Sequence, residues 1–347
     1  APISTAGRPR EGGERHQESQ QKDKARGVAS HGGVDAPEAG IFHFMRALLA
    51  LDAPRVRPDH AARPMHAPLP PDFLKNVRVD PDVARAFDTL PLELNELGFD
   101  PWGFHAETAK VLYTLARPLA QYFRPVVTGI ENIPAGRVLL VPNHSGQLPI
   151  DGMVIAISTL LNAQPARLVR AMAERWFPTI PFINMAFSRA GVVVGDPINC
   201  KNLLEADNAI LVFPEGARGC GKVWSERYKL VSFGRGFMRL ALQTGTPIVP
   251  VSVVGAEESI PSIMNLSRLA KMLGAPYLPV SPFLPLLGPL AYFPLPTRFY
   301  IDFGAPLRFE GAFDDEDDAV QEKVDLVQST VQGMIDARLA LRQSVFG

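Results

Sequence analysis

From residue 137 onward, short apolar runs alternate with helical stretches, and this alternation limits the possible folds more than any other feature of the chain. The runs that predict buried strands are Arg137–Val141, Arg167–Ala171, Gly191–Val194, Ala209–Phe213, Pro247–Val254 and Arg298–Phe303. A helix is expected over Gly234–Gln243, because Gly245 then provides a favourable C-terminal cap. This pattern predicts an α/β fold, a mostly parallel central sheet flanked by helices, in one domain.

Two more helices are expected outside the alternating region. Over Ala106–Tyr122 the large apolar side chains share one helical face: Val111, Leu112, Leu115, Leu119 and Tyr122. Near the C-terminus the apolar positions recur at intervals of four and three: Val320, Val324, Val327, Val331, Met334 and Ile335. That spacing predicts an amphipathic helix, and the acidic run Asp314–Asp318 lies near its N-terminus, where the helix dipole favours negative charge. We expect this helix to cover the core.

The first part of the chain differs in composition from the rest. Residues 1–40 contain three large aliphatic side chains and no aromatic one, so burial there cannot offset the entropy of ordering the backbone. Pro-rich sequence from Pro54 to Pro71 follows. We therefore expect a disordered tail and Pro-rich linker over 1–70, and a folded domain over 81–347 with N-terminal helices and the C-terminal amphipathic helix.

Charge and cysteine content exclude several classes of function. The formal net charge is −1, with 35 basic and 36 acidic residues, so nucleic acid is not an expected partner. The two cysteines, Cys200 and Cys220, cannot build a disulfide framework and lack the spacing of metal ligands, so we expect a reducing compartment and no metal. The apolar stretch Leu278–Leu295 contains five prolines, which argues against a membrane-spanning helix.

Two predicted strands run into polar sequence that could carry chemistry, Asn143–Asp151 and Pro214–Arg218. A hydroxyl is a poor nucleophile at neutral pH until a base takes its proton, and histidine suits that role when a carboxylate orients its other ring nitrogen. His144 is the candidate base and Asp151 the candidate orienting carboxylate. The alternative is a loop histidine beside an aspartate that caps a helix beginning at Gly152.

Three motifs in order resemble the lysophospholipid (glycerolipid) acyltransferase family, the 1-acylglycerol-3-phosphate acyltransferase-like enzymes. That family carries a His-and-Asp motif, a Phe-Pro-Glu-Gly motif and a Val-Pro-type strand, which here stand as Asn143–Asp151, Phe213–Arg218 and Ile248–Val251. The resemblance covers roughly Gly129 to Pro306. It implies that residues 81–347 form an acyltransferase domain.

The resemblance also implies the reaction. The donor would be acyl-CoA or acyl-carrier protein, used as co-substrate without metal or separate cofactor, and the acceptor hydroxyl would attack the thioester directly. Glu215 and Arg218 would shape the acceptor site rather than form a covalent intermediate. By the same resemblance, the substrate-binding residues would be Asn143, Ser145, Gly146, Phe213, Pro214, Glu215, Gly216, Arg218 and Pro250.

Two departures from the family pattern bear on the acceptor. Six residues separate His144 from Asp151 instead of the usual four, as in a subgroup related to mono- and diacylglycerol acyltransferases. The arginine that grips the acceptor phosphate in the family is missing from Gly191–Asp196, although Arg189 lies just upstream. An uncharged glyceride or long-chain alcohol is therefore an alternative to a lysophospholipid.

The loop after the second motif is basic. Arg218, Lys222, Arg227 and Lys229 could contact a phosphate of the acceptor or of CoA, or they could form an ordinary solvated loop. Gly216–Lys222 partly fits a phosphate-binding loop, but Val223 stands where Ser or Thr should hold magnesium. The sequence contains no Gly-x-Ser-x-Gly elbow, which argues against a serine hydrolase.

A lipid acceptor requires contact with a bilayer. Without a spanning helix we expect a cytoplasmic protein that associates peripherally with a membrane surface, through the apolar segment Pro276–Pro296 or the patch Ile41–Leu51. Either segment could instead be a covering loop or part of the tail. The alternative from another functional class is a non-catalytic lipid-binding protein on the same fold.

Overall fold

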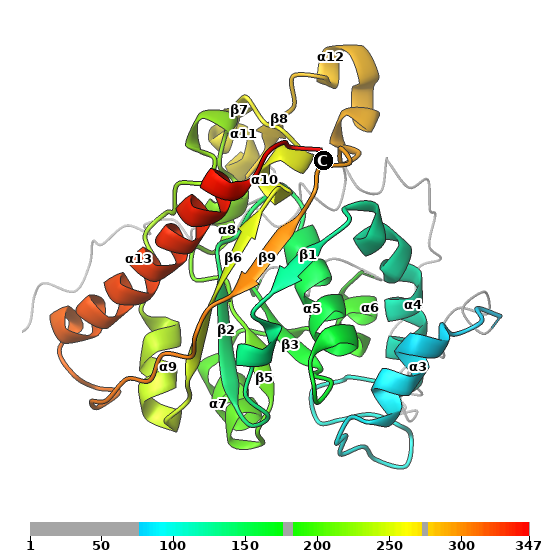
Figure 1. Cartoon of the computed structure of the whole chain (residues 1–347), viewed down its shortest axis with the longest axis vertical. Helices are drawn as coiled ribbons and strands as arrows, with labels where there is room; N and C mark the ends of the chain where they lie inside the picture. Colours follow the sequence, from blue (N-terminus) through cyan, green and yellow to red (C-terminus); the bar gives the residue numbers. More distant parts are fainter. Residues whose placement is uncertain (1–75, 176–182, 273–276, 347) are drawn as a thin grey trace, which may run out of the picture.

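A seven-stranded sheet forms the framework of the part of the chain that the computed structural model describes, residues 76–175, 183–272 and 277–346 (Figure 1). Its strands are β1 (Val126–Thr128), β2 (Val138–Pro142), β3 (Val169–Ala173), β4 (Val193–Val194), β5 (Ala209–Leu211), β6 (Ile248–Val254) and β9 (Tyr300–Phe303). Across the sheet they follow the order β1-β9-β6-β2-β5-β3-β4. The neighbouring strands from β6 to β4 run parallel, whereas β9 is antiparallel to β6 and pairs in parallel with β1. The predicted α/β fold with a mostly parallel sheet is confirmed.

The two faces of the sheet carry separate apolar cores, because successive side chains of a strand point to opposite faces. In β2, Val138 and Leu140 enter the core that is shared with α3 (Pro81–Asp88), α4 (Ala106–Tyr122) and α5 (Ile150–Asn162). Leu139 and Val141 enter the core that is shared with α7 (Pro197–Glu205), α9 (Gly236–Thr244) and α13 (Asp317–Leu341). All four side chains are fully buried. A strand covered on both faces has a continuous apolar sequence, and β2 shows that pattern.

Shorter elements lie in the connections. They are the helices α6 (Ile183–Arg189), α8 (Ala217–Cys220), α10 (Ala256–Ser259), α11 (Ser267–Met272) and α12 (Leu284–Leu287), the 3-10 turns η1 (Ile130–Asn132), η3 (Trp224–Glu226) and η4 (Gly288–Tyr292), and the antiparallel ribbon of β7 (Met264–Asn265) and β8 (Pro279–Val280). Figure 1 shows α8, α10, α11 and α12 together at the upper end of the molecule, where β6 ends. The described connections that contain these four helices therefore gather at one edge of the sheet.

Local sequence explains where the main helices begin and end. The side chain of Asp80 accepts hydrogen bonds from the first turn of α3, and Pro81 occupies the first helical position. Gly245 ends α9 in the left-handed conformation, with φ of 61°, as predicted. The C-terminal helix is confirmed as α13, and its predicted apolar stripe is buried, apart from the half-buried Met334.

The helix α4 has the predicted bounds, but the predicted apolar stripe is not its buried face. Ala109, Tyr113 and Ala120 are buried, whereas Leu115 and Leu119 are 49% and 38% exposed. The helix packs against α3 and α5. Its alanines allow close approach, and the Tyr113 ring meets the Phe87 ring of α3 edge-on, with centroids 5.5 Å apart. Burial there raises the pKa of the Tyr113 hydroxyl to about 12. The stripe of large apolar side chains therefore does not identify the face by which α4 packs.

The tail predicted over 1–70 and the patch Ile41–Leu51 lie outside the described residues. The first described helix, α3, begins at Pro81, where the folded domain is expected to start. Within the described ranges, no helix is long and apolar enough to cross a membrane.

Candidate active site

The candidate base and its carboxylate lie together beyond the carboxyl end of β2. The chain turns after His144 at Gly146, which has φ of 79°, and Pro149 leads into α5. The helix begins at Ile150 rather than Gly152, so Asp151 lies inside its first turn instead of capping it. His144 Nδ1 is 2.9 Å from Asp151 Oδ2. The structure therefore brings these two predicted residues into direct contact.

Asp151 is fully buried and held by backbone donors as well as by the ring. Its Oδ2 accepts the Ser145 N–H at 2.9 Å, and its Oδ1 accepts the Gly152 N–H at 2.7 Å. These bonds, at the N-terminus of α5, stabilise the ionised carboxylate. The ionised form favours the His144 tautomer in which Nδ1 carries the proton and Nε2 is left to accept one.

The imidazole ring of His144 is fixed on its other sides too. It stacks on the Phe213 ring, with centroids 4.0 Å apart and planes at 25°. Its Nε2 lies 2.9 Å from the sulfur of Cys220, at the end of α8. Burial by itself lowers the pKa of His144, but the Asp151 carboxylate and then Cys220 raise it well above its ordinary value.

Asn143 and Ser145, which flank the histidine, are both fully buried. The Asn143 side chain pairs with both backbone groups of Val253 in β6: its amide donates to the carbonyl oxygen at 3.0 Å, and its oxygen accepts the N–H at 2.7 Å. Asn143 thus joins the end of β2 to β6. The Ser145 hydroxyl is buried without a hydrogen-bond partner among the described residues.

The second motif follows β5, the neighbour of β2, and supports the first. Glu215 is buried, and its Oε1 accepts the backbone N–H of His144 at 2.8 Å. Its Oε2 accepts the Val231 N–H at 2.8 Å. Pro214 accepts the Gly234 N–H through its carbonyl, and Gly216 turns the chain into α8 with φ of 59°. Glu215 therefore contacts the protein and holds the histidine backbone in place.

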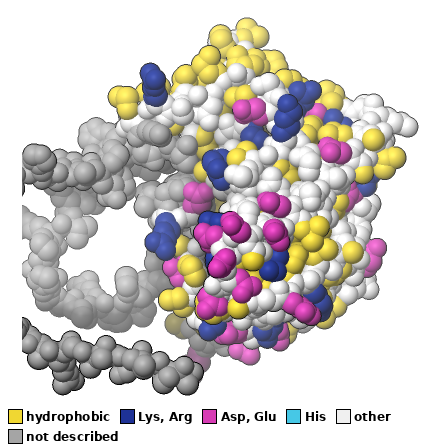
Figure 2. Space-filling model, turned by 90° about the vertical axis from the view of Figure 1, so that its left-hand side faces the viewer, with side chains coloured by type: hydrophobic (Ala, Val, Ile, Leu, Met, Phe, Trp, Pro, Cys, Tyr) yellow, Lys and Arg dark blue, Asp and Glu magenta, His cyan; other side chains and the backbone are white. Residues whose placement is uncertain are grey.

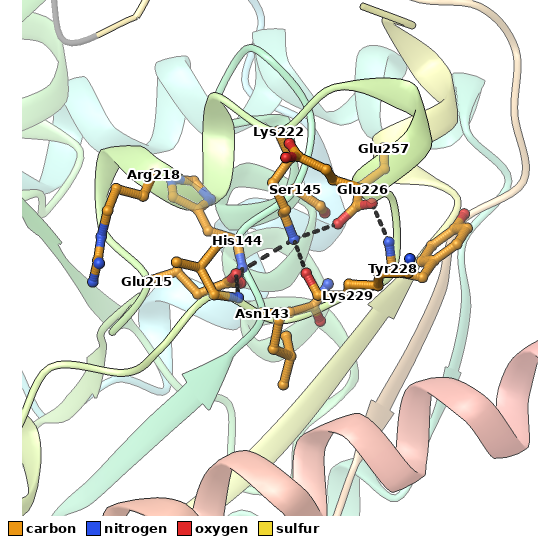
Figure 3. Close-up of polar contacts among 12 residues, drawn as sticks. Asn143, His144, Ser145, Glu215, Arg218, Lys222, Glu226, Tyr228, Lys229 and Glu257 are labelled. Carbon is orange, nitrogen blue, oxygen red and sulfur yellow. Dashed lines mark hydrogen bonds and ion pairs between the residues drawn. The ribbon is translucent and has the colours of Figure 1, made fainter.

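A buried ion-pair cluster extends from Glu215 to the end of β6 (Figure 3). Lys222 Nζ lies 2.7 Å from Glu257 Oε1 in α10 and 3.4 Å from Glu215 Oε2. Burial lowers the pKa of Lys222, but the two carboxylates outweigh it and raise that pKa. Lys222 is thus neither a solvated loop residue nor free to meet a phosphate. Glu257 follows directly after β6, and this position at a strand end was the sequence signal that could have marked it as a site residue.

The other predicted binding residues lie farther from the histidine ring. Arg218 is exposed, donates to the Ser232 carbonyl at 3.0 Å, and extends away from His144 (Figure 3). Pro250 is buried within β6 and pairs with Val141 of β2. The pairing of β6 with β9 ends at the next residue, Val251, so the N–H that proline lacks is tolerated here. Arg227 lies over the Trp224 ring, 4.4 Å from its centroid.

A cavity of about 620 Å³ opens near the carboxyl ends of β3 and β4. Its described lining has no charged side chain and consists of Pro101, Trp102, Ala173, Asn184, Met185, Ser188, Val192, Val193, Val194 and Asn199. Arg189, the nearest candidate for the missing phosphate-gripping arginine, is buried with its guanidinium over the Phe99 ring. The cavity therefore suits an apolar or uncharged group.

Across the described residues, no group of three or more His, Cys, Asp or Glu side chains is arranged to hold a metal ion.

The residue that the sequence interpretation missed is Cys220, which was considered for disulfides and metals alone. Its position five residues after Glu215, in the loop at a strand end, was the available signal.

Comparison with known proteins finds similar sequences and one similar structure. A family model described as Acyltransferase matches residues 124–254. The protein of Mycobacterium tuberculosis (strain H37Rv) with the name "Uncharacterized protein Rv0502" is 37% identical over 258 residues, which cover 73% of this chain and 71% of that protein. The chloroplastic 1-acyl-sn-glycerol-3-phosphate acyltransferase LPAT1 of Arabidopsis thaliana is 28% identical over 178 residues, 47% of this chain and 45% of that one.

Two further proteins are similar to this chain. The human "DGAT1/2-independent enzyme synthesizing storage lipids" is 25% identical over 211 residues, 60% of each chain. Among solved structures, the 1-acyl-sn-glycerophosphate (LPA) acyltransferase PlsC of Thermotoga maritima matches 69% of this chain and 83% of that one, with a TM-score of 0.46 and 20% identity.

Proposed function

Because the chain belongs to the acyltransferase family, we propose that it moves a fatty acyl group from a thioester to a hydroxyl of a glycerolipid such as a lysophospholipid. The donor is acyl-CoA or an acyl-carrier protein, and the thioester serves as co-substrate without a separate cofactor. The observation that carries the proposal is the 2.9 Å contact between His144 Nδ1 and the buried Asp151 carboxylate. This contact supports a tautomer with the proton on Nδ1, which leaves Nε2 as the proposed acceptor of the hydroxyl proton.

The reaction follows from that arrangement. The acceptor hydroxyl gives its proton to His144 Nε2 as its oxygen attacks the thioester carbonyl carbon. Asp151 stabilises the imidazolium that forms. When the carbon–sulfur bond breaks, the imidazolium returns the proton to the leaving thiolate. Glu215 and Phe213 act as positioning residues, since they hold the histidine backbone and ring.

A neutral acceptor, such as a mono- or diacylglycerol or a long-chain alcohol, is the second candidate, and the cavity near β3 and β4 favours it. That cavity is lined by uncharged side chains, and Arg189 is buried against Phe99 rather than placed to hold a phosphate. Neighbouring strands lie about 4.8 Å apart, so β4 is about 14 Å from β2, a distance that a long aliphatic chain spans. An acceptor with a long chain could thus extend along this edge.

The test is release of CoA from oleoyl-CoA with a panel of acceptors. Lysophosphatidic acid and a monoacylglycerol with the same chain form a matched pair that differs in the phosphate, and a long-chain alcohol, a diacylglycerol and other lysophospholipids complete the panel. We expect His144→Ala to abolish release with every acceptor, because the replacement removes the proposed base. His105→Ala, which removes a histidine that caps α4, is the control. Absence of wild-type release with all acceptors would leave a lipid-binding role on the same fold.

We further propose that the enzyme reaches its acceptor as a peripheral membrane protein, through the segment 281–296. That segment contains no Asp, Glu, Lys or Arg. Five of its large side chains are exposed: Phe283 39%, Leu286 84%, Leu287 46%, Leu290 71% and Phe293 64%. Figure 1 places α12 at the upper end of the molecule, on the side of α8 and α10, and the upper end in Figure 2 is mainly apolar. An uncharged apolar projection beside the catalytic edge suits insertion between lipid headgroups.

A further inference from the structure

A carboxylate lies at the first residue of α8, beside the motif that holds the candidate base. Glu174 follows β3 directly, and its Oε1 accepts the Ala217 N–H at 2.7 Å. A Cβ at Gly216 would lie 3.2 Å from the same oxygen. A glutamate side chain is ionised at neutral pH, so Glu174 places a negative charge in front of the Gly216–Ala217 backbone.

The helix α8 connects this carboxylate to the reacting nitrogen. It runs from Ala217 to Cys220, and at a rise of about 1.5 Å per residue these two positions are roughly 4.5 Å apart along its axis. Cys220 Sγ lies 2.9 Å from His144 Nε2, and a Cβ at Gly219 would lie 2.8 Å from the His144 Cβ. Glu174 therefore contacts one end of a single helical turn, and the histidine ring lies at the other end.

The charge of Glu174 also acts on Tyr277, which contacts the loop between the base and its carboxylate. The Tyr277 hydroxyl donates to the Gln147 carbonyl at 2.9 Å. Burial raises the pKa of the Tyr277 hydroxyl, and the Asp151 and Glu174 carboxylates are among the groups that raise it further. Both carboxylates are thus close enough to the same hydroxyl to act on it.

Glu174 lies between the candidate base and the uncharged cavity. In the sheet, β3 is placed between β5, which leads into α8, and β4, which lines the cavity. Ala173, the residue before Glu174, lines the cavity as well. An acceptor with its chain in the cavity and its hydroxyl at His144 must therefore pass its polar head by Glu174.

The arginines that follow β3 and β5 have partners that hold them in place. Arg175 Nη2 lies 3.3 Å from Asp196 Oδ2, at the end of β4. Arg218 donates to the Ser232 carbonyl at 3.0 Å and extends away from His144 (Figure 3). Neither guanidinium is placed by these contacts to hold a phosphate between the cavity and the histidine.

We propose that Glu174 determines the class of acceptor: its carboxylate repels the phosphate of a lysophospholipid and admits an uncharged glyceride or long-chain alcohol. The proposal rests on the proposed acyl transfer at His144 and chooses between its two classes of acceptor. A phosphate monoester carries one to two negative charges at neutral pH, so it is repelled by a carboxylate at close range. A glycerol hydroxyl is neutral and can donate a hydrogen bond to the same carboxylate.

The experiment compares kcat/KM for a monoacylglycerol and for lysophosphatidic acid with the same short acyl chain, both presented as monomers with oleoyl-CoA as donor. We expect the wild type to prefer the monoacylglycerol. Glu174→Gln should reduce that preference by about 10-fold, because the amide keeps the shape and removes the charge. Glu174→Asp keeps the charge and should keep most of the preference. Glu205→Gln changes an exposed glutamate at the end of α7, near the start of β5, and is the matched control that should keep all of it.

The salt dependence distinguishes repulsion between charges from a change of shape. Salt screens exposed like charges, so the wild-type preference for the monoacylglycerol should fall as NaCl is raised from ~0.05 to ~0.5 M. The preference of Glu174→Gln should change little over that range. Effects of salt on the donor cancel in the ratio, because both acceptors are measured with the same thioester.

Two outcomes separate this proposal from the proposed function. Wild-type turnover with a preference for lysophosphatidic acid, or with a preference that Glu174→Gln leaves unchanged, would overturn the role of Glu174 while acyl transfer stands. No wild-type turnover with either acceptor or with a long-chain alcohol would overturn the proposed function and this assignment with it. If Glu174→Gln fails to fold, the salt dependence of the wild-type preference still decides.

Discussion

At the scale of single residues, His144 is held from four directions. Glu215 accepts its backbone N–H, Asp151 lies at Nδ1, Cys220 lies at Nε2, and Phe213 stacks on the ring. Such restraint leaves little freedom to the ring. A catalytic base needs this restraint, because a small misplacement of the reacting nitrogen lowers the rate strongly.

The first prediction concerns Asp151→Asn. An amide can present its own N–H to Nδ1, which reverses the tautomer and removes the lone pair from Nε2. We expect kcat to fall on the order of 10³- to 10⁴-fold while the fold is kept. CoA release and thermal unfolding, measured together, check this. Asp207→Asn, at an exposed position paired with Arg137, is the control and should leave the rate unchanged.

The second prediction is the pH dependence of kcat/KM. Burial lowers the pKa of His144, but Asp151 and then Cys220 raise it well above the ordinary 6.5. Only the neutral ring can take a proton, so activity should rise with pH through a value above 6.5. Glu215 lies at the backbone of this residue rather than at its ring. In Asp151→Asn the rise of the residual activity with pH should occur at a lower pH than in the wild type. The carboxylate charge that raises the pKa of His144 is gone in that variant. An unshifted profile in that variant would contradict this account.

At the scale of structural elements, the carboxyl ends of three adjacent strands build the site. β2 supplies His144, β5 supplies the Glu215 loop and α8, and β6 leads into α10 with Glu257. Lys222 contacts both the Glu215 carboxylate, in the loop after β5, and the Glu257 carboxylate, in α10. This cluster couples the position of α10 to the backbone of the histidine.

The third prediction tests that coupling with Lys222→Met. Loss of the ammonium leaves two buried carboxylates without their cation, which should lower the free energy of unfolding by about 3–5 kcal/mol. Activity should also fall, since Glu215 positions the His144 backbone. Denaturant titration gives the first quantity and CoA release the second. Lys201→Met breaks an exposed pair with Glu205 and should change the free energy of unfolding by less than about 1 kcal/mol.

At the scale of the whole molecule, the edge of the sheet that carries the candidate site and the apolar projection 281–296 lie at the same end (Figure 1). The opposite end carries the turns that enter the strands. A protein arranged in this way can present its active site toward a bilayer while the rest remains in water.

The fourth prediction is that Leu286→Asp together with Leu290→Asp lowers binding to phosphatidylcholine vesicles by at least ~10-fold, because two exposed side chains can no longer enter the lipid. Co-sedimentation measures it. Leu97→Asp, at a position 75% exposed in the connection between α3 and α4, should bind like the wild type. Turnover of a water-soluble short-chain acceptor should be unchanged in the double variant. Equal vesicle binding by all three proteins would assign lipid contact to another surface.

The sequence by itself determined the features that depend on neighbours along the chain. Continuous apolar runs located β2, β5 and β6, intervals of four and three located α13, and the loop Asn143–Asp151 contains both the base and its carboxylate, seven positions apart. Such features are local, because hydrophobic periodicity and turn residues act over one element.

The tertiary structure alone decided which loops meet. Cys220 reaches Nε2 across 76 positions, and Glu257 meets Lys222 across 35, because β5 and β6 both flank β2 in the sheet. The sequence pattern does not encode strand order, the antiparallel direction of β9 or the face by which α4 packs. The physical reason is that strand order, strand direction and the packed face of a helix depend on contacts between elements that are distant in the chain. The hydrophobic periodicity of the sequence indicates only which side chains each element buries.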